Sequence, residues 1–245
     1  MYANLKKKFG QNFLVDNNIL LKISNLIKSE NISILEIGPG NGLLTDKVIL
    51  KKPSKLTLVE IDKDLINYLK EKYLGEEYIE IINANILDMR LDNKYELIIS
   101  NLPYNISSQV LVKLALLKNS ANQLVLMFQK EFAQRLLEKN INSINSLIRC
   151  FYNIKLEFHV SKNCFRPIPK VNSSILTFSK KDKKLLKNDE INDFIIFKRN
   201  LFSHKRKSLK NLLKKYNIEN DFNLNLRVEN LELKTLIAIF RKINS

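Results

Sequence analysis

Six consecutive residues, Ser-Asn-Leu-Pro-Tyr-Asn at positions 100–105, bring together groups that could recognise an amino group on a flat ring. The apolar run at 95–99 predicts a buried strand that ends where this polar segment begins. Asn101 offers an amide oxygen, Pro103 stiffens the backbone and Tyr104 offers an aromatic face. Asn and Pro are also common in ordinary turns, so this interpretation depends on what the rest of the chain supplies.

A glycine-rich turn, Gly-Pro-Gly-Asn-Gly at 38–42, lies between an expected strand at 32–37 and an expected helix at 43–49. Glycines let a ligand approach the backbone closely, and the start of a helix offers free N–H donors. The next expected strand, 55–61, carries Glu60 about twenty residues after the turn, where a carboxylate can accept both ribose hydroxyls of a nucleoside. The pair predicts a nucleoside site, and a tight turn with a solvated glutamate is the alternative.

The spacing of the glycines selects among nucleoside cofactors. The order Gly-x-Gly-x-Gly differs from the Gly-x-Gly-x-x-Gly of dinucleotide binders, and no second cofactor-binding half follows. S-adenosylmethionine needs a ribose-binding acid and adenine contacts but no pyrophosphate cradle, so it fits better than NAD. A third expected strand at 78–82 is followed by Asn-Ala-Asn-Ile at 83–86, where a polar side chain could contact the adenine of the cofactor.

The elements that must position these residues alternate between strand and helix, which predicts an α/β fold with a mostly parallel sheet and right-handed crossovers. Beyond the segments above, we expect a helix at 17–28 capped by Asp16, a helix at 107–117 capped by Ser107 or Ser108, a strand at 124–128, a helix at 129–138, and strands at 155–160 and 174–178.

Two further segments could line a cleft or merely cover the surface. The lead-in at 6–14, Lys-Lys-Lys-Phe-Gly-Gln-Asn-Phe-Leu, is too polar and too interrupted by glycine for a core element, which favours a surface arm. The loop at 163–171 contains Pro167 and Pro169, which predict a stiff extended loop rather than a strand. Its Phe165 either plugs this loop onto the body of the protein or forms a second aromatic wall of the active cleft.

The charge balance points to a polyanionic partner. The 245 residues include 41 Lys and Arg against 25 Asp and Glu, a net charge of +16. Such a surplus favours nucleic acid or an anionic membrane surface, although a compositional bias toward Ile, Lys and Asn contributes to it. The N-terminus lacks the apolar run of a signal peptide, and no stretch approaches the roughly 18 to 20 apolar residues of a membrane span. Because the chain has only two cysteines and two histidines far apart, we expect no disulfide framework, no metal site and a cytoplasmic location.

The last quarter of the chain differs from the rest. The segment 179–184 resembles a linker, and residues 185–245 show only helical periodicity, which predicts a small helical domain. From Lys180 onward there are 17 basic and 8 acidic residues, a net charge of +9. Because the basic residues are concentrated in this part of the chain, including the run at 204–210, they favour nucleic-acid binding rather than a compositional bias of the whole sequence.

Five motifs in this order resemble the bacterial small-subunit rRNA adenine dimethyltransferases over nearly the whole chain. They are Phe-Gly-Gln-Asn-Phe-Leu at 9–14, Glu-Ile-Gly-Pro-Gly at 36–40, Asn-Leu-Pro-Tyr-Asn-Ile-Ser at 101–107, Phe-Arg-Pro-Ile-Pro-Lys-Val at 165–171 and Phe-Ser-His-Lys-Arg-Lys-Ser-Leu at 202–209. The Asn-Leu-Pro-Tyr motif alone is typical of amino-methyltransferases in general, whereas the whole set is specific to this family.

The resemblance implies a Rossmann-like class I methyltransferase domain over 1–179, with a mostly parallel seven-stranded sheet, and a small all-α RNA-binding domain over 185–245. It implies catalytic roles for Asn101, Leu102, Pro103, Tyr104 and Phe165. It implies S-adenosylmethionine contacts from Asn12, Leu14, Gly38, Gly40, Glu60, Ile61, Asn85, Ile86 and Asn101. It implies RNA contacts from Lys6, Lys7, Lys8, Lys170, His204, Lys205, Arg206, Lys207 and Lys210. The family usually has Asp where this chain has Asn85, and an amide can still accept from the adenine amine if it is suitably oriented.

The expected reaction is transfer of methyl groups from S-adenosylmethionine to the exocyclic amines of two adjacent adenosines near the 3′ end of small-subunit rRNA. The expected partners are that RNA and the immature 30S subunit, and we expect a monomer. Two alternatives stay open. One is a large-subunit rRNA adenine methyltransferase of the antibiotic-resistance type, although Leu102 and Pro39 favour the small-subunit type. The other is a non-catalytic ribosome assembly factor on a methyltransferase fold.

Overall fold

The computed structural model describes residues 12–92, 94–204, 206–214, 216, 218 and 222–244. The chain forms two compact units. The first comprises the residues up to Ala133 together with Asn153–Lys180, and the second comprises Gln134–Tyr152 together with the residues from Lys181 onward. The second unit therefore takes in a segment that lies inside the range 1–179 expected for the methyltransferase domain.

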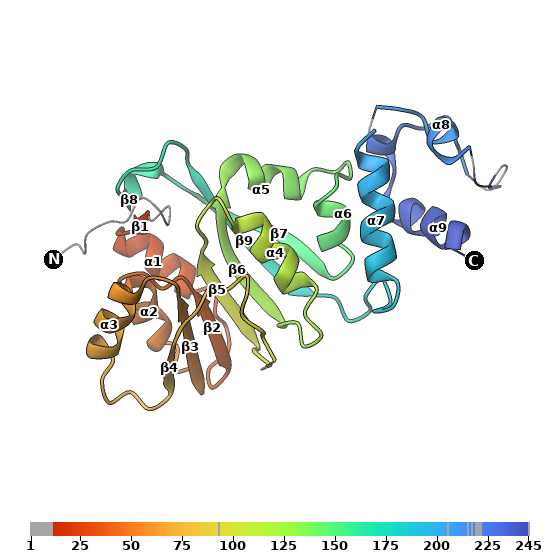
Figure 1. Cartoon of the computed structure of the whole chain (residues 1–245). Coiled ribbons are helices and arrows are strands. Elements are labelled where there is room, and N and C mark those ends of the chain that lie inside the picture. The colour runs from red at the N-terminus through yellow and green to blue at the C-terminus, as the bar shows by residue number, and fades with distance from the viewer. Residues whose placement is uncertain are drawn as a thin grey trace. The chain divides into compact units, whose positions relative to one another are not determined.

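A seven-stranded sheet, in the order β4-β3-β2-β5-β6-β9-β7, forms the centre of the first unit (Figure 1). The strands are β2 (Ser33–Ile37), β3 (Lys55–Glu60), β4 (Ile79–Asn83), β5 (Leu97–Asn101), β6 (Gln123–Gln129), β7 (Tyr152–Val160) and β9 (Ser173–Lys180). Neighbours from β4 to β6 pair in parallel, and β9 pairs antiparallel with β6. The expected mostly parallel seven-stranded sheet is confirmed.

The central strands are mainly apolar, as expected where both faces of a sheet are covered. Ile34 of β2, Ile99 of β5 and Val125 of β6 are all buried. The chain runs outward from β2 through β3 to β4, and then returns to place β5 on the other side of β2. Ligands of open parallel sheets bind beyond the carboxyl ends of the strands at such a reversal. The turn after β2 and the segment after β5 therefore meet at this point.

The helices of the first unit are α1 (Asn17–Ser24), α2 (Leu43–Ile49), α3 (Lys63–Lys72), α4 (Ser107–Ala115) and α5 (Lys130–Leu137), the last of which continues into the second unit. The expected cap of α1 is confirmed, since Oδ1 of Asp16 accepts the N–H groups of Asn18 and Ile19 at 3.0 Å each. The serine cap expected for α4 is wrong. Its N-cap is Ile106, and the Ser107 hydroxyl instead donates to the carbonyl of Tyr104 at 3.0 Å.

A second, two-stranded sheet joins the N-terminal lead-in to the proline-rich loop. In it β1 (Phe13–Leu14) pairs antiparallel with β8 (Phe165–Arg166), so that Leu14 lies opposite Phe165. The lead-in was expected to be a surface arm and the loop to contain no strand, and both expectations are wrong at these positions. Each segment contributes apolar side chains that are buried, so the pairing removes them from water and satisfies backbone groups of both.

The second unit is mainly helical, as expected, over the residues that the structure describes. It contains α6 (Asn145–Ile148), α7 (Ile191–Phe202), α8 (Leu209–Leu213), a 3₁₀ turn at Val228–Asn230 and α9 (Leu233–Asn244). The rings of Phe194 and Phe197 in α7 pack on Phe240 in α9, with centroids 5.3 and 5.5 Å away. A single bridge between Ser208 and Arg227 adds an antiparallel contact that helical periodicity does not predict.

Candidate active site

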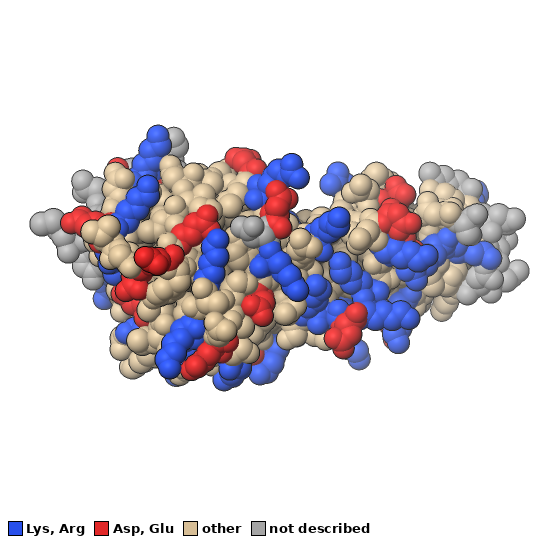
Figure 2. All heavy atoms as spheres, turned by 90° about the horizontal axis from the view of Figure 1, so that it is seen from below, with Lys and Arg blue, Asp and Glu red and all other residues tan. Residues whose placement is uncertain are grey.

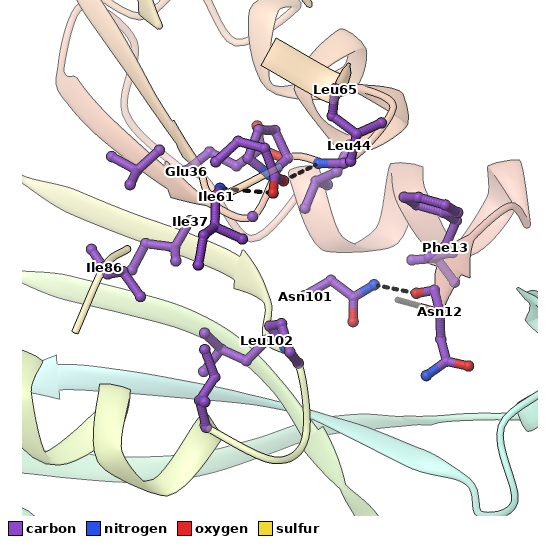
Figure 3. A pocket seen from close by; sticks show the side chains of 18 of the residues that line it. Asn12, Phe13, Glu36, Ile37, Leu44, Ile61, Leu65, Ile86, Asn101 and Leu102 are labelled. Atoms are coloured by element: carbon purple, nitrogen blue, oxygen red, sulfur yellow. Dashed lines mark hydrogen bonds between the residues drawn. The ribbon is translucent and has the colours of Figure 1, made fainter. Parts of the chain in front are cut away.

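A cavity of about 230 Å³ lies at the carboxyl end of the sheet in the first unit (Figure 3). Its walls come from five segments together with Leu20 of α1 and Leu65 of α3, and four of the segments lie at the ends of parallel strands. The five segments are residues 12–14 in and before β1, 36–44 at the end of β2, 59–61 at the end of β3, 84–87 after β4 and 101–106 after β5. Segments far apart in the sequence therefore meet here because parallel strands end at the same edge.

The glycine turn after β2 has positive φ angles of +66° at Gly38, +61° at Gly40 and +77° at Gly42, which glycine adopts without strain. Two of these glycines also leave room for neighbours. A Cβ on Gly40 would lie 2.7 Å from the ring of Phe13, and a Cβ on Gly42 would collide with the hydroxyl of Tyr73. The ring of Phe13 and the hydroxyl of Tyr73 thus pack against the turn at positions where only glycine leaves room for them.

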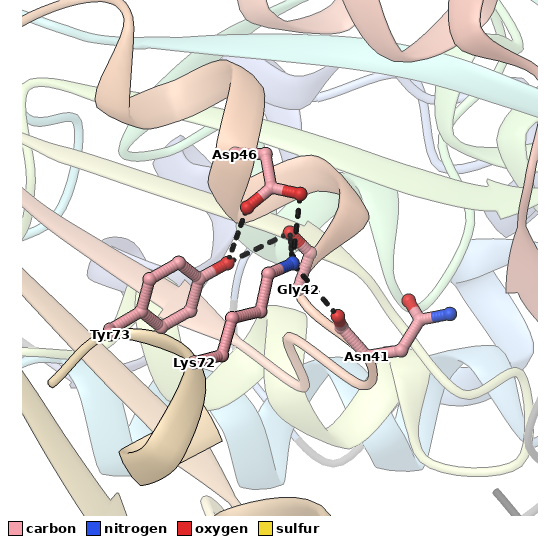
Figure 4. A network of polar contacts seen from close by, with 5 residues as sticks. All are labelled: Asn41, Gly42, Asp46, Lys72 and Tyr73. Atoms are coloured by element: carbon pink, nitrogen blue, oxygen red, sulfur yellow. Dashed lines mark hydrogen bonds and ion pairs between the residues drawn. The ribbon is translucent and has the colours of Figure 1, made fainter. Parts of the chain in front are cut away.

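Two side chains at the end of α3 hold the glycine turn from outside (Figure 4). The Tyr73 hydroxyl lies 3.0 Å from the carbonyl of Gly42 and 2.8 Å from Oδ1 of Asp46. Nζ of Lys72 donates to Oδ2 of Asp46 at 2.8 Å and to the carbonyls of Asn41 and Gly42 at 3.3 Å. Burial and the hydrogen bond to Asp46 raise the pKa of Tyr73 above its ordinary range, so the hydroxyl keeps its proton. Carbonyls of the turn are thereby drawn toward α3.

Glu60, the last residue of β3, is held by backbone donors on both sides. Its Oε1 accepts the N–H groups of Ile61 and Asp62 at 2.8 and 3.0 Å, and its Oε2 accepts the N–H of Gly40 at 3.2 Å. Burial raises the pKa of this carboxyl, and the three backbone donors oppose that rise. The carboxylate is consequently fixed in the wall of the cavity beside the glycine turn.

Glu36 opens the motif at 36–40 but was not among the expected site residues. It lies in β2, lines the cavity, and is only 1% exposed. Its Oε2 has no hydrogen-bond partner among the described residues, and burial raises its pKa to about 8. An acidic residue between the apolar residues of a central strand, two residues before the glycine turn, was the available signal. The cavity therefore contains a buried carboxyl whose charge a cationic ligand group would stabilise.

The Asn-Leu-Pro-Tyr segment begins at the last residue of β5. The Asn101 amide points toward Asn12, and its Nδ2 donates to the carbonyl of Asn12 at 3.3 Å (Figure 3). This contact orients the amide, so that Oδ1 is left as an acceptor. The Tyr104 hydroxyl bonds the hydroxyl of Ser173 in β9 at 2.7 Å, and burial raises its pKa. The amide and the aromatic ring are both held by residues outside the motif.

The structure brings most of the expected site residues to this one cavity. The residues that line it are Asn12, Leu14, Gly38, Gly40, Glu60, Ile61, Asn85, Ile86, Asn101, Leu102, Pro103 and Tyr104. The expectation that Phe165 forms a second aromatic wall is corrected. Its side chain is fully buried in the hydrophobic core with Leu14, opposite which it pairs, and it does not line the cavity.

The expected RNA-binding residues are distributed over both units. Lys170 is exposed in the first unit, and the exposed ones in the second are His204, Arg206, Lys207 and Lys210. Lys6, Lys7, Lys8 and Lys205 lie outside the described residues. In Figure 2, Lys and Arg side chains gather in the right half of the view, where Asp and Glu are sparse. Among the described residues, no group of three or more His, Cys, Asp and Glu could hold a metal ion, and every helix is too short or too polar to cross a membrane.

The similarity of this chain to known proteins extends over nearly its full length. The sequence model of the family described as "Ribosomal RNA adenine dimethylase" matches residues 2–243. "Ribosomal RNA small subunit methyltransferase A" of Mycoplasma capricolum is 39% identical, covering 97% of each chain. The protein of the same description from Mycoplasmopsis pulmonis is 34% identical, covering 97% of this chain and 98% of its own.

Two solved structures share the architecture. A dimethyladenosine transferase from Plasmodium falciparum is 27% identical and superimposes with a TM-score of 0.80, covering 94% of this chain and 95% of its own. The 23S rRNA methyltransferase ErmE, at 20% identity and a TM-score of 0.77, covers 95% of this chain and 100% of its own, which shows the fold alone. The family match and the full-length relatives together show that this chain belongs to the ribosomal RNA adenine dimethylase family.

Proposed function

We propose that this protein transfers methyl groups from S-adenosylmethionine to the exocyclic amines of two adjacent adenosines near the 3′ end of small-subunit rRNA. The observation that carries the proposal is the meeting, in one cavity, of the Asn101–Tyr104 segment with the glycine turn and Glu60. The Asn101–Tyr104 segment can hold an adenine amine, and the glycine turn and Glu60 suit a nucleoside methyl donor. The full-length relatives described as small-subunit methyltransferases support the choice of RNA.

The donor and acceptor groups of the cavity fit S-adenosylmethionine. The fixed carboxylate of Glu60 can accept ribose hydroxyls, and Asn85 with Ile86 can contact the adenine. The unpartnered oxygen of Glu36 and the turn at Gly38 and Gly40 suit the charged amino-acid end. When bound, this cofactor supplies a sulfonium methyl group as the electrophile.

The residues after β5 would hold the amine of the target adenine. Oδ1 of Asn101 and the backbone carbonyl of Leu102 can accept its two hydrogens, which favours a pyramidal nitrogen with a directed lone pair. Pro103 restricts the backbone at this carbonyl. The ring of Tyr104, fixed through Ser173, can stack on the base, which must be single-stranded or flipped out of its helix. Positioning, rather than a strong base, would promote the transfer: the N–C bond forms as the S–C bond of the donor breaks, the thioether leaves, and the cationic methylated amine loses its proton to solvent.

The basic residues would bind the phosphate backbone. The exposed Lys170, Arg206, Lys207 and Lys210 can neutralise phosphates, and His204 can add a hydrogen bond. We include Lys6, Lys7, Lys8 and Lys205 in this proposal on the sequence alone. The proposed substrate is the RNA within an immature 30S subunit, bound by a monomer, and a ribosomal substrate implies a cytoplasmic location.

Transfer of labelled methyl groups to unmethylated small subunits tests the proposal. We expect incorporation at two adjacent adenosines near the 3′ end, located by mapping methyl groups on the product RNA. Incorporation into large-subunit RNA instead would support a methyltransferase of the resistance type. Binding to small subunits with no incorporation, under conditions in which the cofactor binds, would support a non-catalytic assembly factor.

A further inference from the structure

The side-chain amide of Asn85 is held at both ends within one turn. Its Oδ1 accepts the backbone N–H of Leu87 at 3.1 Å, and its Nδ2 donates to Oδ2 of Asp88 at 2.7 Å. The backbone carbonyl of Asn85 also accepts the N–H groups of Asp88 and Met89, each at 3.0 Å. The turn at 85–89 is therefore folded around this one residue, which lines the cavity.

The two partners fix which end of the amide faces which way. If the amide were turned over, its NH₂ would face the Leu87 N–H, and its oxygen would face the carboxylate of Asp88. Donor would then meet donor and acceptor would meet acceptor, so both contacts would be repulsive. The Leu87 donor alone weakly favours the observed orientation, and the negative charge of Asp88 enforces it. In this orientation Oδ1 keeps a second lone pair.

A separate contact holds the turn in place. Nζ of Lys113 in α4 donates to the carbonyl of Leu87 at 2.7 Å and to the carbonyl of Met89 at 2.5 Å. These carbonyls flank Asp88, so the backbone on both sides of it is held by α4. Asp88 itself is exposed, and its side chain contributes nothing to the core. Replacing it should leave the fold intact while releasing the amide.

We propose that Asp88 is a positioning residue for recognition of the cofactor's adenine. It holds the Asn85 amide with its oxygen available as an acceptor, so that an amide can take the place of the carboxylate usual in the family. An acceptor at this point matches the exocyclic amino group of adenine and disfavours the carbonyl oxygen of hypoxanthine. This inference rests on the proposed function, because it requires an adenosine cofactor in the cavity.

Calorimetric binding to the full chain, without RNA, tests this role with S-adenosylhomocysteine and S-inosylhomocysteine as probes. For Asp88→Ala we expect the Kd for S-adenosylhomocysteine to rise about fivefold, as for one lost hydrogen bond. The freed amide can then turn over and donate to the inosine carbonyl, so discrimination between the two probes should also fall about fivefold or more. Asp88→Asn is the comparison variant, because its amide can pair with the Asn85 amide in either orientation: the Kd for S-adenosylhomocysteine should stay within about threefold of the native value while discrimination between the two probes falls.

Exchange of the two residues gives an independent test. Asn85→Asp replaces the 2.7 Å hydrogen bond by two facing carboxylates and should raise the Kd for S-adenosylhomocysteine about tenfold, even though it restores the residue usual in the family. Asn85→Asp combined with Asp88→Asn restores a donor–acceptor pair and should recover binding to within about threefold. The melting temperature of every variant is measured alongside and should stay near the native value.

Two results would overturn the proposal. One is Asp88→Ala with native affinity and native discrimination. The other is Asn85→Asp binding at least as tightly as the native chain, because the carboxylate of Asp88 would then have no influence on residue 85. Neither result touches the proposed function. That would be contradicted by a native chain that binds neither probe.

Discussion

The buried carboxyl of Glu36 gives the sharpest prediction about stability. The unfolded chain releases this proton near the ordinary pKa of 4.5, whereas the folded chain keeps it until about pH 8. The folded state therefore binds more protons than the unfolded state between these values, and its stability falls as the pH rises through them. Glu36→Gln keeps a neutral group of similar shape at every pH, which removes this loss.

The size of the effect follows from the two pKa values. A shift from 4.5 to about 8 corresponds to a cost of about 4 kcal/mol at pH 8, as an upper bound for a fully buried group. For a chain of this length such a difference corresponds to about 10 °C in melting temperature. We therefore expect the melting temperature of Glu36→Gln, relative to the native chain, to increase by about this amount between about pH 5 and about pH 8.

Thermal unfolding followed by circular dichroism, without cofactor, measures this difference, and Glu157→Gln is the matched control. Burial alone would raise the pKa of Glu157, but hydrogen bonds from Thr177 at 2.7 Å and Lys155 at 3.0 Å outweigh it and lower the pKa. Glu157 therefore adds stability above its unfolded pKa, and Glu157→Gln should become relatively less stable as the pH rises from acid. A flat difference between Glu36→Gln and the native chain from about pH 5 to about pH 8 would refute the reasoning, since Glu36 would then be ionised in the folded state throughout.

Three further predictions concern binding and turnover. Asn101→Ala should lower methyl transfer about 100-fold while RNA affinity, measured by filter binding, stays within about twofold; an equal loss of both would contradict its assigned role. Tyr73→Phe removes the hydroxyl that holds the glycine turn. It should raise the calorimetric Kd for S-adenosylmethionine about fivefold and leave turnover at saturating cofactor nearly unchanged. A loss confined to turnover would argue against a role of Tyr73 in shaping the cofactor site. Combined replacement of Arg206, Lys207 and Lys210 by Ala should lower the slope of log affinity for RNA against log salt by about two to three, and an unchanged slope would move the RNA-binding face elsewhere.

The positions of the strand ends could be predicted from the sequence because local patterns specify them. The strands expected at 32–37, 55–61 and 95–99 end within two residues of the observed carboxyl ends of β2, β3 and β5, which are Ile37, Glu60 and Asn101. Once alternation with helices implies a parallel sheet, these three ends must meet at one edge. The meeting of Gly38, Glu60 and Asn101 in the wall of one cavity could therefore be predicted without knowledge of any long-range contact.

The pairing of β1 with β8 could not be predicted in the same way. Leu14 and Phe165 lie about 150 residues apart, and neither short segment has periodicity of its own. Burial of Phe165 depends on its partner strand, so the sequence left its role open between a plug and a cleft wall. The cap of α4 failed for a local reason, since the helix begins one residue earlier than a Ser107 cap requires, and the Ser107 hydroxyl donates to the carbonyl of Tyr104 three residues before it. A long-range pairing decided the first case, and the local turn before α4 decided the second.

The same limit applies to the chemistry of the two amides in the cavity. The sequence identifies Asn101 and Asn85 but not which end of each amide is available. In the structure, the Asn12 carbonyl takes Nδ2 of Asn101, and the Asp88 carboxylate takes Nδ2 of Asn85. Each partner occupies the donor end and leaves the oxygen as an acceptor, with one lone pair of the Asn85 oxygen already taken by the N–H of Leu87, and an acceptor is what recognition of an adenine amine requires. Under the proposed role of Asp88, an amide at position 85 can accept from an adenine amine because its neighbour holds the donor end, and replacement of Asp88 should remove that preference.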